Sequence, residues 1–166
     1  MVSPFAVANY FIWLANETGS FLSNLKLQKL VYYAQAWHLA LEESPLFEED
    51  FEAWIHGPVL PTLYQKYESF SWKPIIENVA KPTLNPQLEK FLKEIADVYF
   101  WCDAYELELM THQEDPWKIA RGNLPLDAPS TDIIKKEWMK EYYAAHAEET
   151  EEDENFAESF SSNLTP

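Results

Sequence analysis

An apolar face that repeats at helical spacing restricts this chain to a helical fold more strongly than any other feature of the sequence. The repeat begins after Ser23 and Asn24, and Pro45 closes it. Its members recur every three or four residues, which matches the 3.6-residue period of an α-helix. They are Leu27, Leu30, Val31, Ala34, Trp37, His38 and Leu41. The pattern predicts a helix over residues 25–42 with one apolar face.

Cap signals and weaker repeats predict further helices along the chain. Ser3-Pro4 and Asn85-Pro86 each pair a capping residue with proline at the first helical position. Helices are expected over 4–17, over a segment from Pro58 with Val59, Leu63 and Tyr67, and over 86–101. Two short helices are expected next, one capped by Asp103 and one capped by Asp115 and ended by Gly122. A last helix is expected to begin at Ser130 or Thr131, with Ile134, Trp138, Tyr142 and Ala145 on one side. Phe51 to Ile55 alternates as a short strand would. The expected fold is therefore mainly α, a compact bundle of about six to seven helices with a minor short strand or hairpin element.

The distribution of charge divides the chain into two parts, and its sign limits the classes of partner that we expect. Twenty-eight acidic residues face 12 basic ones, a net charge of −16. Residues 147–166 hold seven of the acidic side chains and no Lys or Arg, so we expect a helical domain over 1–146 followed by an acidic disordered tail over 147–166. Without the tail the net charge is still −9. A field of this sign repels phosphate backbones and attracts basic partners, so nucleic acid is not an expected partner.

Other features of the sequence predict a cytoplasmic location. Charged residues interrupt every apolar run before it reaches the roughly 18 to 20 residues that span a bilayer, so no membrane association is expected. The first residues lack the basic and apolar regions of a secretory signal. Cys102 is the one cysteine, which excludes an internal disulfide.

Catalytic and metal-binding patterns are absent from the sequence. None of the four histidines pairs with another at the spacing of a zinc motif. The three glycines are not spaced for phosphate binding. We therefore expect no enzyme activity, no cofactor and no metal. One enzyme alternative stays open, a His-carboxylate metal-dependent site that would require His56 and His112 to converge in a cleft.

Three blocks of sequence resemble the Panacea, or SocA-like, antitoxin domain, known also from phage-associated proteins. The first is residues 25–36, Leu-Lys-Leu-Gln-Lys-Leu-Val-Tyr-Tyr-Ala-Gln-Ala. The second runs from Pro45-Leu46-Phe47 to Phe-Glu-Ala-Trp-Ile-His-Gly-Pro-Val at 51–59. The third is residues 108–117, a Thr-His pair followed by Pro-Trp. With these blocks in order, the resemblance covers about residues 5–143.

The resemblance implies packed helices with a small sheet element and a function that depends on binding another protein. It implies an antitoxin that neutralises a cognate toxin encoded by a neighbouring gene. An alternative within the same family is an adaptor that delivers a bound client to a protease. The two differ in the half-life of the bound protein, which an adaptor shortens.

Positions that match the family blocks give the candidate partner-binding residues. They are Lys29, Tyr33, Trp54, His56, His112 and Trp117. Structural roles are open for several of them: Tyr33 could cover the core while Lys29 pairs with a local carboxylate, Trp54 could fill the core, and His112 could end one helix before the next begins.

Overall fold

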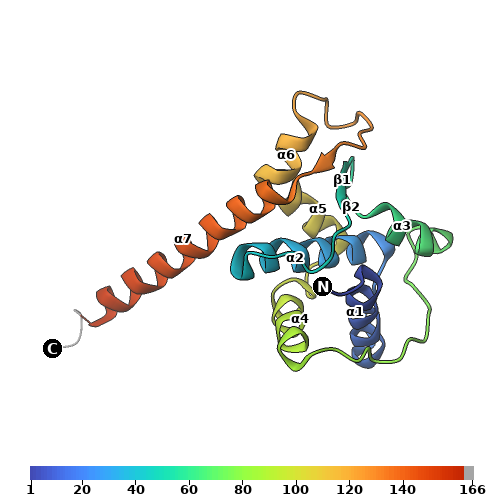
Figure 1. Cartoon of the computed structure of the whole chain (residues 1–166), viewed down its shortest axis with the longest axis horizontal. Helices are drawn as coiled ribbons and strands as arrows, with labels where there is room; N and C mark the ends of the chain where they lie inside the picture. The colour runs from blue at the N-terminus through green and yellow to red at the C-terminus, as the bar shows by residue number, and fades with distance from the viewer. Residues whose placement is uncertain (163–166) are drawn as a thin grey trace.

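The computed structural model describes the backbone of residues 1–162 and the side chains of residues 1–149 (Figure 1). Within this part of the chain, seven α-helices accompany a three-stranded antiparallel sheet. In chain order the elements are α1 (Pro4–Thr18), α2 (Asn24–Glu42), β1 (Phe51–Trp54), β2 (Gly57–Val59), α3 (Pro61–Tyr67), a 3-10 turn (Glu68–Phe70), α4 (Pro86–Tyr99), α5 (Ala104–Gln113), α6 (Asp115–Arg121), β3 (Ile133–Ile134) and α7 (Lys136–Ser162). The mainly α fold with a minor strand element is confirmed.

Helix α2 lies at the centre of the molecule (Figure 1). It contacts α1, α3, α4, α5, α7 and strand β2. Every residue from 26 to 36 is buried. The prediction of a single apolar face was therefore wrong for this helix, because neighbours enclose it on all sides.

The polar residues of α2 are accommodated because each bonds to a partner in the interior. Gln35 donates to the Phe47 carbonyl at 2.8 Å and accepts from the Leu46 amide at 2.7 Å. Gln28 accepts from the Leu60 amide at 3.0 Å. A buried polar group without a partner would cost about 1–3 kcal/mol. These bonds avoid that cost, and they fasten the segments on either side of the sheet to the central helix.

The sheet is small, with strand order β2-β1-β3. Ala53 pairs with Pro58 and Trp54 with Gly57, which leaves Ile55 and His56 as a two-residue turn. Phe51 pairs with Ile134 on the other side of β1. The sheet therefore brings the start of α7 next to a hairpin that lies about 80 residues earlier in the chain.

Most predicted helices are confirmed, and two boundaries were wrong. The third helix begins at Pro61 and leaves Val59 in β2, because proline is tolerated only in a first helical turn. The last helix begins at Lys136, so Ile134 belongs to β3. In both cases strand pairing replaced the local helical pattern, with Glu52 in the same hairpin for Val59 and with the distant Phe51 for Ile134.

The predicted division at residue 146 stays a prediction. Helix α7 continues through Ser162, which differs from the disorder expected for residues 147–162. The side chains of residues 150–162 and all of residues 163–166 lie outside the described residues. No α-helix in the described part combines the length and apolar character needed to cross a membrane.

Candidate functional site

The turn between β1 and β2 is held against α2 by an unusually close contact. Gly57 has a φ of +101°, and a Cβ at this position would lie 2.5 Å from Cε of Lys29 and 2.8 Å from Oγ1 of Thr111. Lys29 is 1% exposed and donates from Nζ to the Pro58 carbonyl at 3.2 Å. Burial lowers the pKa of this amine to about 7. The lysine of the first sequence block therefore anchors the hairpin from below.

A carboxylate on α5 faces the hairpin from the side. Nδ1 of His56 lies 2.7 Å from Oε1 of Glu108. Nε2 of His112 lies 3.9 Å from the same oxygen. The His56 side chain is 61% exposed, whereas those of Glu108 and His112 are 19% and 20% exposed. One oxygen atom is thus shared by an exposed histidine and a largely buried one.

The buried histidine is oriented by a tryptophan. The His112 ring stacks on Trp117 with centroids 4.0 Å apart and planes 15° apart. Burial lowers the pKa of His112, which favours its neutral form. Nε1 of Trp117 donates to the Trp54 carbonyl at 2.9 Å. The stack therefore connects α5 and α6 to the end of β1.

Arg121, the only arginine in the sequence, fixes the loop on the other side of the sheet. Its guanidinium donates to the carbonyls of Ala53 at 3.2 Å, Pro125 at 2.8 Å and Ala128 at 2.6 Å. It also lies 4.9 Å from the Trp117 ring centroid. One buried side chain thus sets the path of the loop that leads from α6 to β3.

An apolar hollow of about 300 Å³ lies beside the hairpin that these contacts hold in place. It is lined by Leu25, Trp54, Ile55, His56, Val59, Tyr64, Pro129, Ser130 and Thr131. The Trp54 ring meets Tyr64 edge to face at 5.0 Å, and its Nε1 donates to Glu52 at 3.2 Å. Hollows of this kind, apolar with a few polar groups at the rim, suit a single large side chain of a binding partner.

The structure places the six predicted site residues at different depths. Trp54 and His56 line the hollow. His112 supports them from α5 and is partly exposed. Lys29 and Trp117 are buried beneath the hairpin.

Tyr33 lies elsewhere in the core. It is fully buried and stacks on Tyr99 at 4.0 Å. Its hydroxyl donates to Glu114 at 2.6 Å. The hydroxyl of Tyr143 donates to the same carboxylate oxygen at 2.9 Å. Burial raises the pKa of Glu114.

The predicted cap of α6 was wrong. Glu114 occupies the N-cap position without a side-chain bond to the helix, and Asp115 is the first helical residue. The Glu114 carboxylate instead turns into the core and accepts the two tyrosine hydroxyls. A carboxylate that is removed from water gains more from such donors than from one cap bond.

Three positions of the site were not predicted from the sequence. Glu108 stands four residues before His112 on one helix, a spacing that places both side chains on one face and could have identified it. Arg121 had a weaker signal, as a lone arginine between the Pro-Trp pair and Gly122. Tyr64 carried no signal that distinguishes it from a core residue.

His56 and His112 do converge, as the enzyme alternative requires, but on a single carboxylate. Among the described residues, no group of three or more His, Cys, Asp or Glu side chains is arranged to hold a metal ion. Nε2 of His112 is buried without a hydrogen-bond partner in this part of the chain. The cluster supports the hairpin, and no reaction follows from its geometry.

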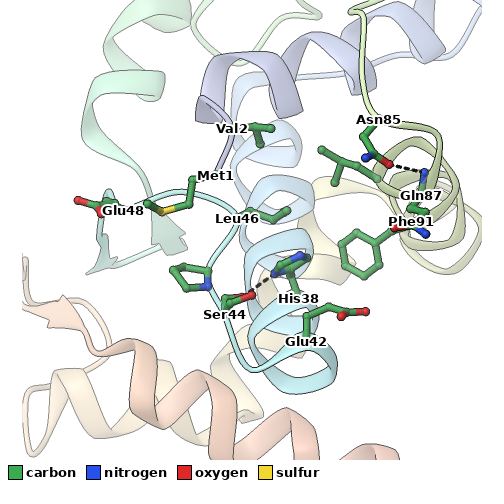
Figure 2. A pocket seen from close by; sticks show the side chains of 12 residues that line it. Met1, Val2, His38, Glu42, Ser44, Leu46, Glu48, Asn85, Gln87 and Phe91 are labelled. Carbon is green, nitrogen blue, oxygen red and sulfur yellow. Dashed lines mark hydrogen bonds between the residues drawn. The ribbon is translucent and has the colours of Figure 1, made fainter.

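A larger hollow of about 620 Å³ lies at the other end of α2 (Figure 2). Nδ1 of His38 donates to the Ser44 carbonyl at 2.6 Å, and the ring meets Phe91 edge to face at 5.6 Å. The remaining walls come from the chain start, the segment after α2 and the first turns of α4. None of the predicted site residues lines it.

Comparison with known proteins agrees with the three sequence blocks. A family model described as "Antitoxin SocA-like, Panacea domain" matches residues 27–118, more than half of the chain. The protein "Antitoxin SocA" of Caulobacter vibrioides (strain NA1000 / CB15N) is 40% identical over 76 residues. That match includes 46% of this chain and spans 40% of the relative's length. No solved structure matches the chain.

Proposed function

Because this chain belongs to the antitoxin SocA-like, Panacea domain family, we propose that it is an antitoxin that neutralises a cognate toxin by binding it directly. The toxin is encoded by a neighbouring gene, and its contact surface is the hollow beside the β1–β2 hairpin. The proposed activity is binding, with no chemical step and no cofactor.

The observation that best supports this surface is the rigid support beneath an exposed apolar hollow. The hairpin turn is fixed by Lys29 from below, by Glu108 from the side and by Trp117 at the end of β1. Interfaces derive most of their affinity from a few aromatic anchors held in well-packed pockets. Preorganised side chains lose little freedom on binding, which favours affinity.

The residues on the surface and those beneath it have different roles in this proposal. Trp54 and His56 contact the toxin, together with Tyr64 on the opposite wall. Lys29, His112 and Trp117 position them. Tyr33 contributes to the core beneath α6 and α7, without a direct contact.

The test is growth of cells that express the neighbouring gene, alone and together with this chain, followed by co-purification of the pair. We expect growth arrest by the neighbour, rescue by this chain and a stable complex. Trp54→Ala should weaken the complex by about 2 kcal/mol, roughly 30-fold in Kd. Trp72→Ala is the matched control, because Trp72 is 79% exposed and does not line the hollow. Equal affinity of both variants, with both folded, would place the contact elsewhere.

The same cells distinguish inhibition from delivery to a protease. An inhibitor leaves the half-life of the toxin unchanged or longer, whereas an adaptor shortens it. A harmless neighbour that forms no complex contradicts both functions.

A further inference from the structure

A groove between α6 and α7 has a surface chemistry unlike that of the hollow beside the hairpin. It measures about 330 Å³ and is lined by residues of α6 and α7. Beyond these residues α7 continues away from the rest of the fold (Figure 1). Its lining residues are Asp115, Ile119, Trp138, Glu141, Tyr142, Ala145, His146 and Glu149. None of them lines the hollow.

The floor of the groove is apolar and aromatic. Ile119 is 51% exposed, a large fraction for an isoleucine on a short helix. The Tyr142 ring stacks on His146 at 4.3 Å, and the two side chains also approach through the hydroxyl and Nε2 at 3.2 Å. The floor therefore combines an exposed aliphatic side chain with a stacked pair of aromatic rings.

The rim of the groove is acidic. Asp115, Glu141 and Glu149 line it, and no Lys or Arg does. From Glu141 to the end of the sequence there are eight acidic residues and no basic one. With a net charge of −16, a second copy of this chain would be repelled.

Two lysines of this chain already contact residues that line the groove. Nζ of Lys135 lies 5.4 Å from the Trp138 ring centroid. Nζ of Lys118 lies 3.9 Å from Asp115, and both side chains are more than half exposed. Exposed pairs of this kind contribute little and exchange readily with another cation.

We propose that this groove binds a partner-protein segment in which arginine or lysine side chains flank an apolar side chain. The apolar side chain contacts Ile119 and Tyr142, and the cations pair with Glu141 and Glu149. Complementary charge accelerates association, and the aliphatic parts of the partner's arginine or lysine side chains pack on the aromatic floor of the groove. The proposal concerns a surface separate from the hairpin hollow and holds whether or not the partner is a toxin.

The experiment measures binding of a fluorescein-labelled amphipathic peptide of leucine and arginine to the full chain by fluorescence anisotropy. The comparison peptide carries glutamate in place of arginine. Glu141→Lys is paired with Glu94→Lys, which makes the same charge change at an exposed position of α4. Ile119→Ser is paired with Ile76→Ser, at a position that is 84% exposed and outside the groove. Circular dichroism confirms that each variant is folded.

We expect Glu141→Lys to raise Kd about tenfold and Glu94→Lys to change it less than about twofold. Ile119→Ser should weaken binding, whereas Ile76→Ser should not. Equal losses in the two lysine variants would mean attraction by total charge alone and would overturn the proposal. So would an unchanged affinity in Ile119→Ser, comparable binding of the glutamate peptide, or no binding of the arginine peptide.

Discussion

Replacement of Lys29 by methionine tests the arrangement beneath the hairpin. The Lys29 pKa falls from the ordinary 10.5 to about 7 because the amine is removed from water. In the unfolded chain the amine binds its proton up to about pH 10.5. Between these two pH values the unfolded state therefore binds more protons than the folded state. The free energy of unfolding must then rise with pH across this window, and the gain is lost as the pH falls toward 7.

The size of the effect follows from the shift. A displacement of about 3.5 pKa units corresponds to about 5 kcal/mol, of which about 4 kcal/mol applies at pH 7, where the folded amine is half protonated. Methionine removes this cost and keeps the apolar stem. It also removes the hydrogen bond to the Pro58 carbonyl, a loss of about 1–3 kcal/mol. Lys29→Met should therefore be more stable than the original chain by about 1–3 kcal/mol at pH 7.

The sign of the difference should reverse at high pH. Near pH 10.5 the folded amine is neutral and the unfolded amine is only half protonated, so the cost that methionine removes has almost vanished. Lys29→Met then loses mainly the hydrogen bond and should be less stable by about 1–3 kcal/mol. Urea unfolding of both proteins at several pH values between 7 and 10.5 measures this. Tyrosines and other lysines titrate in both proteins, so their contributions cancel in the difference.

Lys118→Met is the control, because it makes the same replacement at a side chain that is 52% exposed. A stability difference for Lys29→Met that is constant across the pH range would refute the reasoning. It would show that the amine keeps its ordinary pKa and reaches water in the folded chain.

Three further substitutions test other contacts of the fold. Gly57→Ala should lower the free energy of unfolding by about 2–4 kcal/mol, because Gly57 has close contacts and a φ of +101°. Gly19→Ala should lower it by only about 1–2 kcal/mol, because Gly19 has a φ of +65° and no atom within 4 Å. Equal denaturant midpoints for the two variants would contradict this. Arg121→Ala should speed amide hydrogen exchange at residues 123–132, because carbonyls of that loop lose their hydrogen-bond donor. Unchanged exchange there would show that the loop keeps its conformation without Arg121. The raised pKa of Glu114 means that the folded chain binds this proton more tightly than the unfolded chain does. The free energy of unfolding of the original chain, relative to that of Glu114→Gln, should therefore fall as the pH rises through that pKa. A rise measured by urea unfolding would contradict the burial argument.

Local pattern predicted the helices well because their caps and periods are encoded within a few residues. Ser3 accepts from the Phe5 amide at 3.1 Å, and Asp103 accepts from the Glu106 amide at 2.8 Å, as their positions before helical repeats suggested. Gly19 ends α1 in the left-handed region. Each of these signals acts within one helical turn, so no knowledge of the rest of the fold was needed.

Long-range pairing explains what the sequence did not predict. Ile134 fits a helical stripe with Trp138, yet it pairs with Phe51 across more than 80 residues. Asp115 was predicted to cap α6, yet Glu114 occupies the N-cap position and its carboxylate turns toward Tyr33 and Tyr143. Competition between a local bond and a distant one is decided by burial, which one sequence does not reveal.

The candidate site was partly predicted for a similar reason. Two of the family-like positions, Trp54 and His56, line the hollow, and their role in partner binding stays a prediction. The motif positions did not distinguish exposed residues from buried ones, because a sequence motif specifies residue identity and not burial. Lys29 and Tyr33 lie one helical turn apart on α2, and both are buried.

The enclosure of α2 has a consequence for how this scaffold can be re-engineered. Residues 26–36, which carry the clearest family signature, lie wholly in the interior and offer no surface on which one partner could be told from another. On the contact surface proposed above, the choice of partner would depend on peripheral positions such as Tyr64 and residues 129–131, which line the hollow and lie outside the central helix. If the proposed contact surface is right, exchanging those peripheral segments between two family members, with α2 unchanged, transfers the partner preference with them.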